Sequence, residues 1–357
     1  MALLWKYGVP GHTVSLLEQM YAETWCRVKL EGEVSERFEV QTGVRQGCAL
    51  SPILFNYHMD NIMREAIESL GGGINISYNT SKGLYLTYRD AVEGSTTVQD
   101  VLYADDLALV AEQRQDLQGM LTVVDMVCKK WGMAISVEKS KVLAVGGGEV
   151  TAPICLNNQT LEEVESFTYL GSSIDKSGKA SAEVDIRLEK GGRAYQMWRK
   201  KVFRSANLSK ATKMRVFRTL VMSVLLYGAE TWTITQKDLR KLRTFHMKCL
   251  RDILGVTRWD ELRNENILCR ANEVPIEGQL KHLRLQWLGH VMRMNSNRVQ
   301  RQLLCSRLTG KVRPRGGTPL RWIDLVARDL AGIGDWKEVV YNKPQWREAI
   351  RPRPTSS

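Results

Sequence analysis

Residues 101–110, VLYADDLALV, constrain the fold of this chain more than any other stretch. Two short apolar runs flank a pair of adjacent carboxylates, Asp105 and Asp106. Runs rich in Val, Leu and Tyr favour β-strands, and the acidic pair between them predicts a tight turn. The carboxylates then project from the tip of a hairpin rather than into the core. An ordinary hairpin with a solvated turn is the alternative interpretation of these residues alone.

Two carboxylates held side by side favour a bound cation. Mg²⁺ suits such a pair, because it prefers oxygen ligands and leaves room for the phosphate groups of a substrate. The Asp105–Asp106 pair is therefore a candidate magnesium site.

The charge of the chain is divided unevenly along its length. Residues 1–175 contain 13 Lys and Arg against 23 Asp and Glu, whereas residues 176–357 contain 38 against 16. The net charge of +12 thus combines −10 in the first half with +22 in the second. A half this basic indicates a polyanionic partner, most often nucleic acid. Basic helix faces that are merely solvated are the alternative.

The sequence disfavours a membrane-spanning segment and an oxidising compartment. The longest apolar run, near residues 220–229, is too short to span a bilayer, so we expect no membrane partner. The seven cysteines are scattered without paired spacing, which is typical of reduced thiols. We therefore expect the protein in the nucleus, the cytoplasm or both.

A glycine turn before a helix is the second candidate site. Ser51 and Pro52 predict the start of a helix that runs to about Leu70, with the Ser51 hydroxyl as its cap. Just ahead, Gln46 offers an amide and Gly47 lacks a Cβ, so a flat ligand can approach the backbone closely. A plain strand-to-helix turn is the alternative.

The remaining pattern predicts a mixed first half and a helical second half. Thr13 is the expected cap of an early helix, and the polar residues 74–97 are expected to form a loop or an irregular hairpin. The other expected elements are hairpins at 26–42 and 167–174, a helix at 117–131, strands at 133–137 and 142–145, and helices at 182–203, 209–227 and 235–254. Residues 313–319 read as a basic linker, and the tail from Arg351 as disordered. Three consecutive helices after a mixed region predict a separate small bundle.

In this order the motifs resemble the palm and thumb of a reverse transcriptase, most of all those of non-LTR (LINE-type) retrotransposons. The similar segments are Thr42–Asn61 (motif B), Tyr103–Asp106 (YADD, motif C), Gly132–Leu143 (motif D) and Phe167–Gly171 (motif E, the primer grip). Further segments similar to the thumb and tail of the same elements are Leu225–Trp232, Leu285–Met294 and Pro319–Asp329. The resemblance covers nearly the whole chain.

The resemblance implies an α+β fold with three parts. These are a partial polymerase palm of antiparallel sheet and packed helices over residues 1–178, an all-α thumb over 179–255 and a basic helical C-terminal region over 256–350. A disordered tail, 351–357, follows.

The resemblance also implies RNA-directed DNA synthesis with an RNA template, a DNA primer, deoxynucleoside triphosphates and Mg²⁺. Asp105 would be a direct metal ligand and Asp106 a weaker one. Lys139 would neutralise or protonate the leaving pyrophosphate, although a surface lysine is the alternative. The remaining positions implied to contact nucleotide or template are Gln46, Gly47, Tyr103 and Ala104, and those of the primer grip are Leu170 and Gly171.

One element of the family pattern is missing. In the family, an aspartate on a strand of motif A completes the metal site, and that strand comes before the segment matching Leu3–Pro10. No Phe-x-x-x-Asp stretch occurs in this sequence. We therefore expect an N-terminally truncated enzyme with impaired activity, since such a site tolerates little misplacement.

Two alternative functions stay open, and so do the questions of zinc binding and of the role of the tryptophans. A non-catalytic nucleic-acid-binding remnant is the strongest, and a group II intron maturase, which shares YADD, is weaker. Zinc binding is disfavoured because the candidate ligands are too widely spaced, namely Cys249, Cys269, His282, His290 and Cys305. Tryptophans of the basic half belong either to the core, which is the more frequent case, or to base-stacking surfaces; these are Trp259, Trp287 and Trp322.

Overall fold

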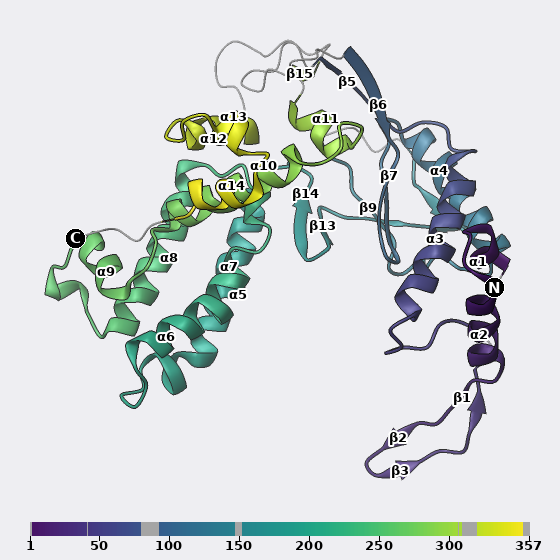
Figure 1. The fold of residues 1–357 in the computed structure, drawn as a ribbon, viewed down its shortest axis with the longest axis horizontal. Helices are drawn as coiled ribbons and strands as arrows, with labels where there is room; N and C mark the ends of the chain where they lie inside the picture. Colours follow the sequence, from purple (N-terminus) through teal and green to yellow (C-terminus); the bar gives the residue numbers. More distant parts are fainter. Residues whose placement is uncertain are drawn as a thin grey trace. The chain divides into compact units, whose positions relative to one another are not determined.

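The computed structural model describes residues 2–40, 42–79, 93–146, 152–305, 307–308 and 320–352. The chain forms two compact units (Figure 1). Unit 1 comprises Met1–Ile76, Thr97–Lys141 and Val150–Glu162, and unit 2 comprises Ser77–Thr96, Val142–Glu149 and Glu163–Ser357. The predicted linker 313–319 and the tail 353–357 lie outside the described residues.

Unit 1 combines four helices of its described part with small antiparallel hairpins. Its helices are α1 (Ala2–Lys6), α2 (Gly11–Ala22), α3 (Ser51–Ile67) and α4 (Arg114–Lys130). Its paired strands are β1 (Trp25–Cys26) with β4 (Phe38–Glu39), β2 (Lys29–Leu30) with β3 (Glu33–Val34), β7 (Asp100–Tyr103) with β8 (Asp106–Leu109), and β10 (Cys155–Leu156) with β11 (Gln159–Thr160). The hairpins predicted at 26–42 and 101–110 are confirmed.

Four further strands lie close to the boundaries between the units in sequence. They are β5 (Ile74–Asn79), β6 (Glu93–Val98), β9 (Lys141–Val142) and β12 (Glu162–Glu163). β5 lies between β6 and the short β15 (Arg307–Leu308) in a three-stranded sheet, and β9 pairs with β12. Residues 74–97, expected to form a loop or an irregular hairpin, contain the neighbouring strands β5 and β6, and the centre of this region, 80–92, lies outside the described residues.

The core of unit 1 lies where α3 packs on α4. Ile62 and Ala66 from α3 and Val124 from α4 are fully buried there. Leu102, Leu107 and Leu109 of the β7–β8 hairpin, and Met133 and Ile135 after α4, pack against this cluster. A helix pair with a continuous apolar seam thus supports the segments on either side of it.

Unit 2 is predominantly helical after one hairpin, β13 (Ser166–Tyr169) with β14 (Ser172–Asp175). Its α-helices are α5 (Ser181–Trp198), α6 (Lys210–Val216), α7 (Ser223–Leu225), α8 (Gln236–Leu254), α9 (Asn264–Ala271), α10 (Ile276–Met292), α11 (Val299–Cys305), α12 (Trp322–Leu330), α13 (Trp336–Val339) and α14 (Lys343–Ala349). Two π-helical turns, η1 (Arg199–Phe203) and η2 (Phe217–Met222), and two 3₁₀ turns, η3 (Ala229–Thr231) and η4 (Arg258–Asp260), complete it. Mixed unit 1 and helical unit 2 confirm the α+β fold class.

Terminal residues close three helix ends of unit 2. The Ser209 hydroxyl accepts a hydrogen bond of 3.1 Å from the backbone N–H of Thr212. Thr235 and Asp238 form a reciprocal capping box at the start of α8. Gly255 ends α8 in the left-handed conformation, with φ +68°. Each satisfies backbone groups that a helix end leaves unpaired.

The last helix of unit 2 is fixed by a large side chain in a glycine-sized gap. Trp346 of α14 is buried, and its indole N–H donates to the backbone carbonyl of Leu285 at 3.0 Å. A Cβ added at Gly289 would overlap the pyrrole edge of this indole. Trp322 is half-buried beside the same cluster and donates through Nε1 to the Glu230 carbonyl at 2.7 Å. The core interpretation is thus confirmed for Trp322.

The capping predicted at two helix starts is wrong. The α2 helix begins at Gly11, directly after Pro10, rather than behind Thr13. Pro10 has a φ of −56°, so the chain enters the helix there without a side-chain cap. Ser51 lies inside α3, and its hydroxyl donates instead to the Arg45 carbonyl at 2.6 Å.

The strand predicted at 133–137 is wrong. These residues alternate between half-buried and exposed because Met133 and Ile135 pack against the α3–α4 core. Their backbone has no partner strand, and the Ser136 carbonyl accepts from the Ser140 N–H at 3.0 Å. Packing on a helix pair therefore produced a period of two without a β-ladder. Of the strand predicted at 142–145, only Val142 is in β9.

No helix of the described residues is long and apolar enough to cross a membrane.

A buried histidine makes the stability of unit 2 depend on pH. His246 of α8 stacks on Phe217, with ring centroids 6.0 Å apart, and burial lowers its pKa to about 4. The unfolded chain therefore binds more protons than the folded one between pH 6.5 and 4, so stability falls as pH drops through this window. We expect chemical denaturation of the wild type to show about 3 kcal/mol more loss from pH 7 to 4 than denaturation of His246→Leu. His290→Leu, at an exposed position on α10, is the control and should keep the wild-type slope.

Candidate functional site

The β7–β8 hairpin places two carboxylates at its tip. Tyr103 pairs with Asp106 across the last rung of the ladder, so Ala104 and Asp105 alone form the turn. Ala104 has a φ of +53°. A positive φ at the first turn residue occurs in type II′ turns, where glycine is usual, and it costs an alanine roughly 1–2 kcal/mol. This strained alanine was not foreseen from the sequence.

The two faces of the hairpin explain why the tip is held firmly yet exposed. Leu102 and Leu107 face the α3–α4 core, whereas the side chain of Tyr103 is 64 % exposed on the other face. Asp105 and Asp106 are both exposed. An apolar face anchored on a helix pair thus presents adjacent carboxylates to solvent.

The donor set fits a divalent ion that is completed by substrate. Mg²⁺ typically takes one or two protein carboxylates together with phosphate oxygens and water. Asp105 and Asp106 supply that number of carboxylates. Across the described residues, no group of three or more His, Cys, Asp or Glu side chains is arranged to hold a metal ion by itself.

The turn at Gln46 and Gly47 lies immediately before α3. Both residues are exposed, and Gly47 has a φ of +86° with open space where a Cβ would lie. A left-handed residue there favours glycine, and the open space beside it leaves the backbone accessible.

Arg45, which sequence reasoning missed, fixes this turn to α2. Its guanidinium donates to the Met20 carbonyl at 2.5 Å and to Thr24 Oγ1 at 3.0 Å, and it lies over the Tyr21 ring. The Arg45 carbonyl in turn accepts from the Ser51 hydroxyl. One arginine thus joins the glycine turn, the preceding helix and the following helix. Its place inside motif B was the only signal in the sequence.

Lys139 lies in an exposed turn after α4. Its backbone N–H donates to Ser136 Oγ at 3.4 Å, and its side chain is exposed. The segment leading to it, through Met133 and Ile135, packs on the same α3–α4 core as the β7–β8 hairpin. One core therefore supports the glycine turn, the carboxylate hairpin and the lysine turn.

The predicted primer-grip residues form the turn of the β13–β14 hairpin in unit 2. Leu170 and Gly171 have φ values of +48° and +80°, as in a type I′ turn. Tyr227 donates its hydroxyl to the Leu170 carbonyl at 2.8 Å, and Arg187 donates to the Gly171 carbonyl. Neither partner was foreseen from the sequence, because both lie at long range from the turn.

A buried ion pair supports this hairpin from α5. Oε1 of Glu183 lies 2.6 Å from Nε of Arg187, and the two side chains are only 5 % and 6 % exposed. The second oxygen of Glu183 accepts from the Ser173 N–H at 2.8 Å. The guanidinium of Arg187 also lies 4.5 Å from the centre of the Tyr227 ring. Both charges are therefore paired and bonded to the hairpin backbone, as buried charges require.

Three of the five zinc candidates named above, His282, His290 and Cys249, contact other groups. Nδ1 of His282 is 2.9 Å from the Ile350 carbonyl, and His290 lies beside the half-buried Trp287. Cys249 is buried in the helical core, and its burial raises the pKa of the thiol to about 12. The side chain of Cys305 lies outside the described residues.

Comparison with known proteins agrees with this arrangement. Residues 2–174 match the family described as reverse transcriptase (RNA-dependent DNA polymerase). This segment, which is similar to the reverse transcriptases, contains the glycine turn, the carboxylate hairpin and the primer-grip turn.

Three related proteins align with most of this chain. A putative uncharacterized transposon-derived protein of Caenorhabditis elegans is 26 % identical, with 71 % of this chain and 96 % of that protein aligned. The Pol polyprotein of the R2DM element of Drosophila melanogaster is 24 % identical over 81 % of this chain, and that of an R2 element of Popillia japonica is 26 % identical over 69 %. The aligned parts are 25 % and 33 % of those two polyproteins. The chain is thus similar to a reverse transcriptase over its first half and to Pol polyproteins of R2 retrotransposable elements over most of its length.

The buried pair under the primer-grip turn generates a stability prediction. Arg187→Leu leaves the Glu183 carboxylate buried without its cation, so we expect a loss of about 3–5 kcal/mol in the free energy of unfolding. Arg193→Leu breaks a pair of the same i,i+4 type on α5, with Glu189, but Arg193 is 75 % exposed. That control should lose less than about 1 kcal/mol. Equal losses in urea denaturation of the two variants would contradict the assigned role.

Proposed function

We propose that this chain carries the nucleotide-transfer surface of an RNA-directed DNA polymerase, which extends a DNA primer on an RNA template with deoxynucleoside triphosphates. The observation that carries the proposal is the hairpin tip, where Asp105 and Asp106 are exposed side by side within the segment that matches the reverse transcriptase family. In this reaction the primer 3′ hydroxyl attacks the α-phosphorus of the nucleotide, and pyrophosphate leaves.

The metal proposed for the hairpin tip is Mg²⁺. When bound, it supplies charge neutralisation at the triphosphate and activation of the primer hydroxyl. Asp105, in the turn itself, is the stronger ligand, and Asp106, opposite Tyr103 in the ladder, the weaker one. Two carboxylates leave the remaining coordination positions to phosphate and water.

The other residues position the substrates. Gln46 and Gly47 shape the surface under the nascent base pair, where the bare Gly47 backbone admits a flat group. Lys139 offers a cation to the leaving pyrophosphate. Leu170 and Gly171 seat the primer end on a turn that Tyr227 and Arg187 hold in place.

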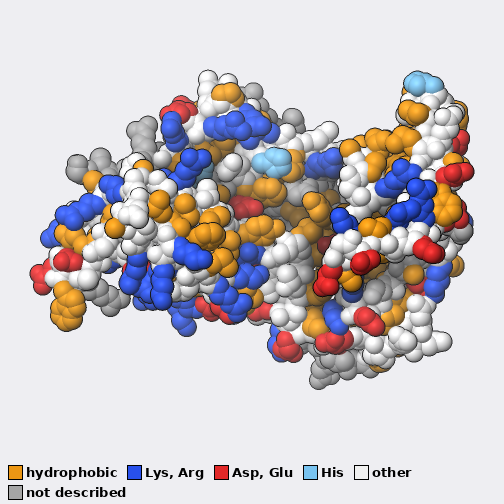
Figure 2. All heavy atoms as spheres, turned by 90° about the horizontal axis from the view of Figure 1, so that it is seen from below, with side chains coloured by type: hydrophobic (Ala, Val, Ile, Leu, Met, Phe, Trp, Pro, Cys, Tyr) orange, Lys and Arg blue, Asp and Glu red, His pale blue; other side chains and the backbone are white. Residues whose placement is uncertain are grey.

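The basic half supplies the attraction for nucleic acid. Residues 176–357 carry a net charge of +22, and Lys and Arg side chains are spread over much of the face of unit 2 visible in Figure 2. Contacts of this kind bind phosphates without regard to sequence and weaken as salt rises.

A second candidate function is nucleic-acid binding without synthesis. It is favoured by the acidic group at the tip, which contains two carboxylates rather than three among the described residues. We propose that the chain on its own binds template–primer but extends it weakly.

The metal assignment can be tested with Tb³⁺, whose luminescence is sensitised by a nearby tyrosine. We expect Tb³⁺ to bind beside Tyr103, and the double variant Asp105→Asn, Asp106→Asn to weaken this binding at least about tenfold. Glu112→Gln removes an exposed carboxylate away from the tip and serves as the control. Undiminished luminescence in the double variant would refute the metal site.

The two functions are separated by binding and extension assays on one sample. We expect fluorescence anisotropy to show salt-sensitive binding of an RNA/DNA template–primer, and Asp105→Asn to leave this binding unchanged. In the extension assay, we expect Mg²⁺-dependent primer extension by the wild type to be close to background. Extension by the wild type that Asp105→Asn abolishes would show that the isolated chain is catalytic. Failure to bind template–primer at low salt would overturn both candidate functions.

A further inference from the structure

An indole exposed to solvent lies just beyond the end of α8. Trp259 is 93 % exposed, whereas Trp322 and Trp346 are packed into the core. The core interpretation of the sequence is therefore wrong for Trp259. Tryptophan is enriched among the residues that dominate binding interfaces, so an indole this exposed is a candidate contact for a ligand.

The loop that carries Trp259 is ordered by its own hydrogen bonds. The Asp260 carboxylate accepts from the backbone N–H and the hydroxyl of Thr257, at 2.6 and 2.8 Å. Arg251 of α8 donates to the Leu262 carbonyl at 3.1 Å and to Asn264 Oδ1 at 2.9 Å. Both ends of the turn are thus tied down while the indole points to solvent.

A cavity of about 710 Å³ lies beside this loop, within unit 2. Its walls come from α5, α8 and the segment leading into α9, and include Tyr195, Arg199, Lys248, Asp252, Thr257 and Asn264. Thr257 lines the cavity and is two residues from Trp259, so at most about 7 Å of backbone separates them. One ligand can therefore contact both.

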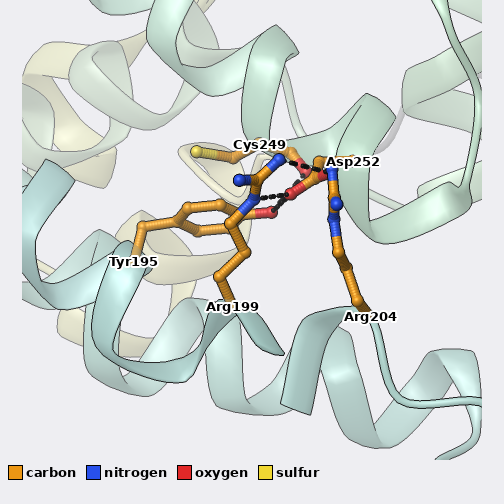
Figure 3. A network of polar contacts seen from close by, with 5 residues as sticks. All are labelled: Tyr195, Arg199, Arg204, Cys249 and Asp252. Carbon is orange, nitrogen blue, oxygen red and sulfur yellow. Dashed lines mark hydrogen bonds and ion pairs between the residues drawn. The ribbon is translucent and has the colours of Figure 1, made fainter. Parts of the chain in front are cut away.

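The charges at the cavity are predominantly positive. Asp252 is shared by Arg199, at 2.7 Å, and Arg204, at 2.6 Å, so one carboxylate compensates two guanidinium groups. Figure 3 shows these groups and the Tyr195 hydroxyl converging on Asp252. Lys248 is exposed and has no carboxylate partner within the described ranges.

Arg243 and Arg251 also line the cavity. Arg243 is paired with Glu277, whereas the partners of Arg251 among the described residues are the neutral groups named above. Part of the positive charge thus remains available to an anionic ligand.

We infer that Trp259 and this cavity bind an unpaired strand of nucleic acid, with a base stacked on the indole and phosphates beside Lys248 and the arginines. A single strand fits better than a duplex, because only an unpaired base exposes the face that stacks on an aromatic ring. A cationic cavity beside the ring suits a phosphate-linked partner better than an apolar peptide. The inference rests on the proposed function only in taking nucleic acid as the partner, and needs neither Asp105 nor a metal ion.

The test measures fluorescence anisotropy of labelled twelve-nucleotide oligo(dT) and oligo(U) and of a duplex of equal length with the full chain. We expect Trp259→Ala to weaken single-strand binding about five- to a hundredfold, Trp259→Phe to restore part of it, and duplex binding to change less than twofold. Trp5→Ala removes another exposed indole, in unit 1, and should leave all three affinities unchanged.

The charge contribution is tested by a matched pair. Lys248→Glu should weaken single-strand binding more than Lys210→Glu, an exposed lysine at the start of α6 that does not line the cavity. Single-strand affinity unchanged in Trp259→Ala would overturn the inference and leave the indole to a protein partner. If Trp259→Ala lost single-strand and duplex affinity equally, the inference would also be overturned. If the wild type bound none of these nucleic acids, the proposed function itself would be refuted.

Discussion

The packing of α3 on α4, with Ile62 and Val124 buried between them, is the interaction on which the carboxylate hairpin and the lysine turn depend. Neither side chain is accessible to solvent, and both belong to one apolar cluster. The glycine turn enters α3, the carboxylate hairpin lies on the cluster through Leu102 and Leu107, and the lysine turn follows Ile135. Exposed polar groups from three parts of the chain are therefore placed by a single dry interface, which resists deformation because it is closely packed.

The β13–β14 hairpin of unit 2 is held by a buried ion pair, whereas the β7–β8 hairpin of unit 1 is held by apolar contacts. Glu183 and Arg187 occupy the space between α5 and the β13–β14 hairpin, and each of them also bonds the hairpin backbone. Such a pair gives little net stability over an apolar equivalent, but it accepts only one arrangement of donors and acceptors. A turn that must present Leu170 and Gly171 in a fixed orientation gains from that restriction.

Local signals predicted the positions of the site residues, but not what holds them. Adjacent carboxylates between two β-prone runs, and Leu-Gly between two others, were sufficient to place both hairpins. Arg45, Arg187 and Tyr227 were not recognised, because each acts on residues distant in sequence and carries no periodic signal. The false strand at 133–137 has the same origin, since burial by a helix pair and burial in a sheet leave the same alternation.

Gly289 and Trp346 are fifty-seven positions apart, yet the structure makes them a single steric unit. Any side chain at 289 would displace the indole, and the loss of the indole would leave a void against α10. A substitution at one of these positions is therefore tolerated only if the residue at the other position accommodates it. Among related chains, the residues at these two positions should change together or remain fixed together.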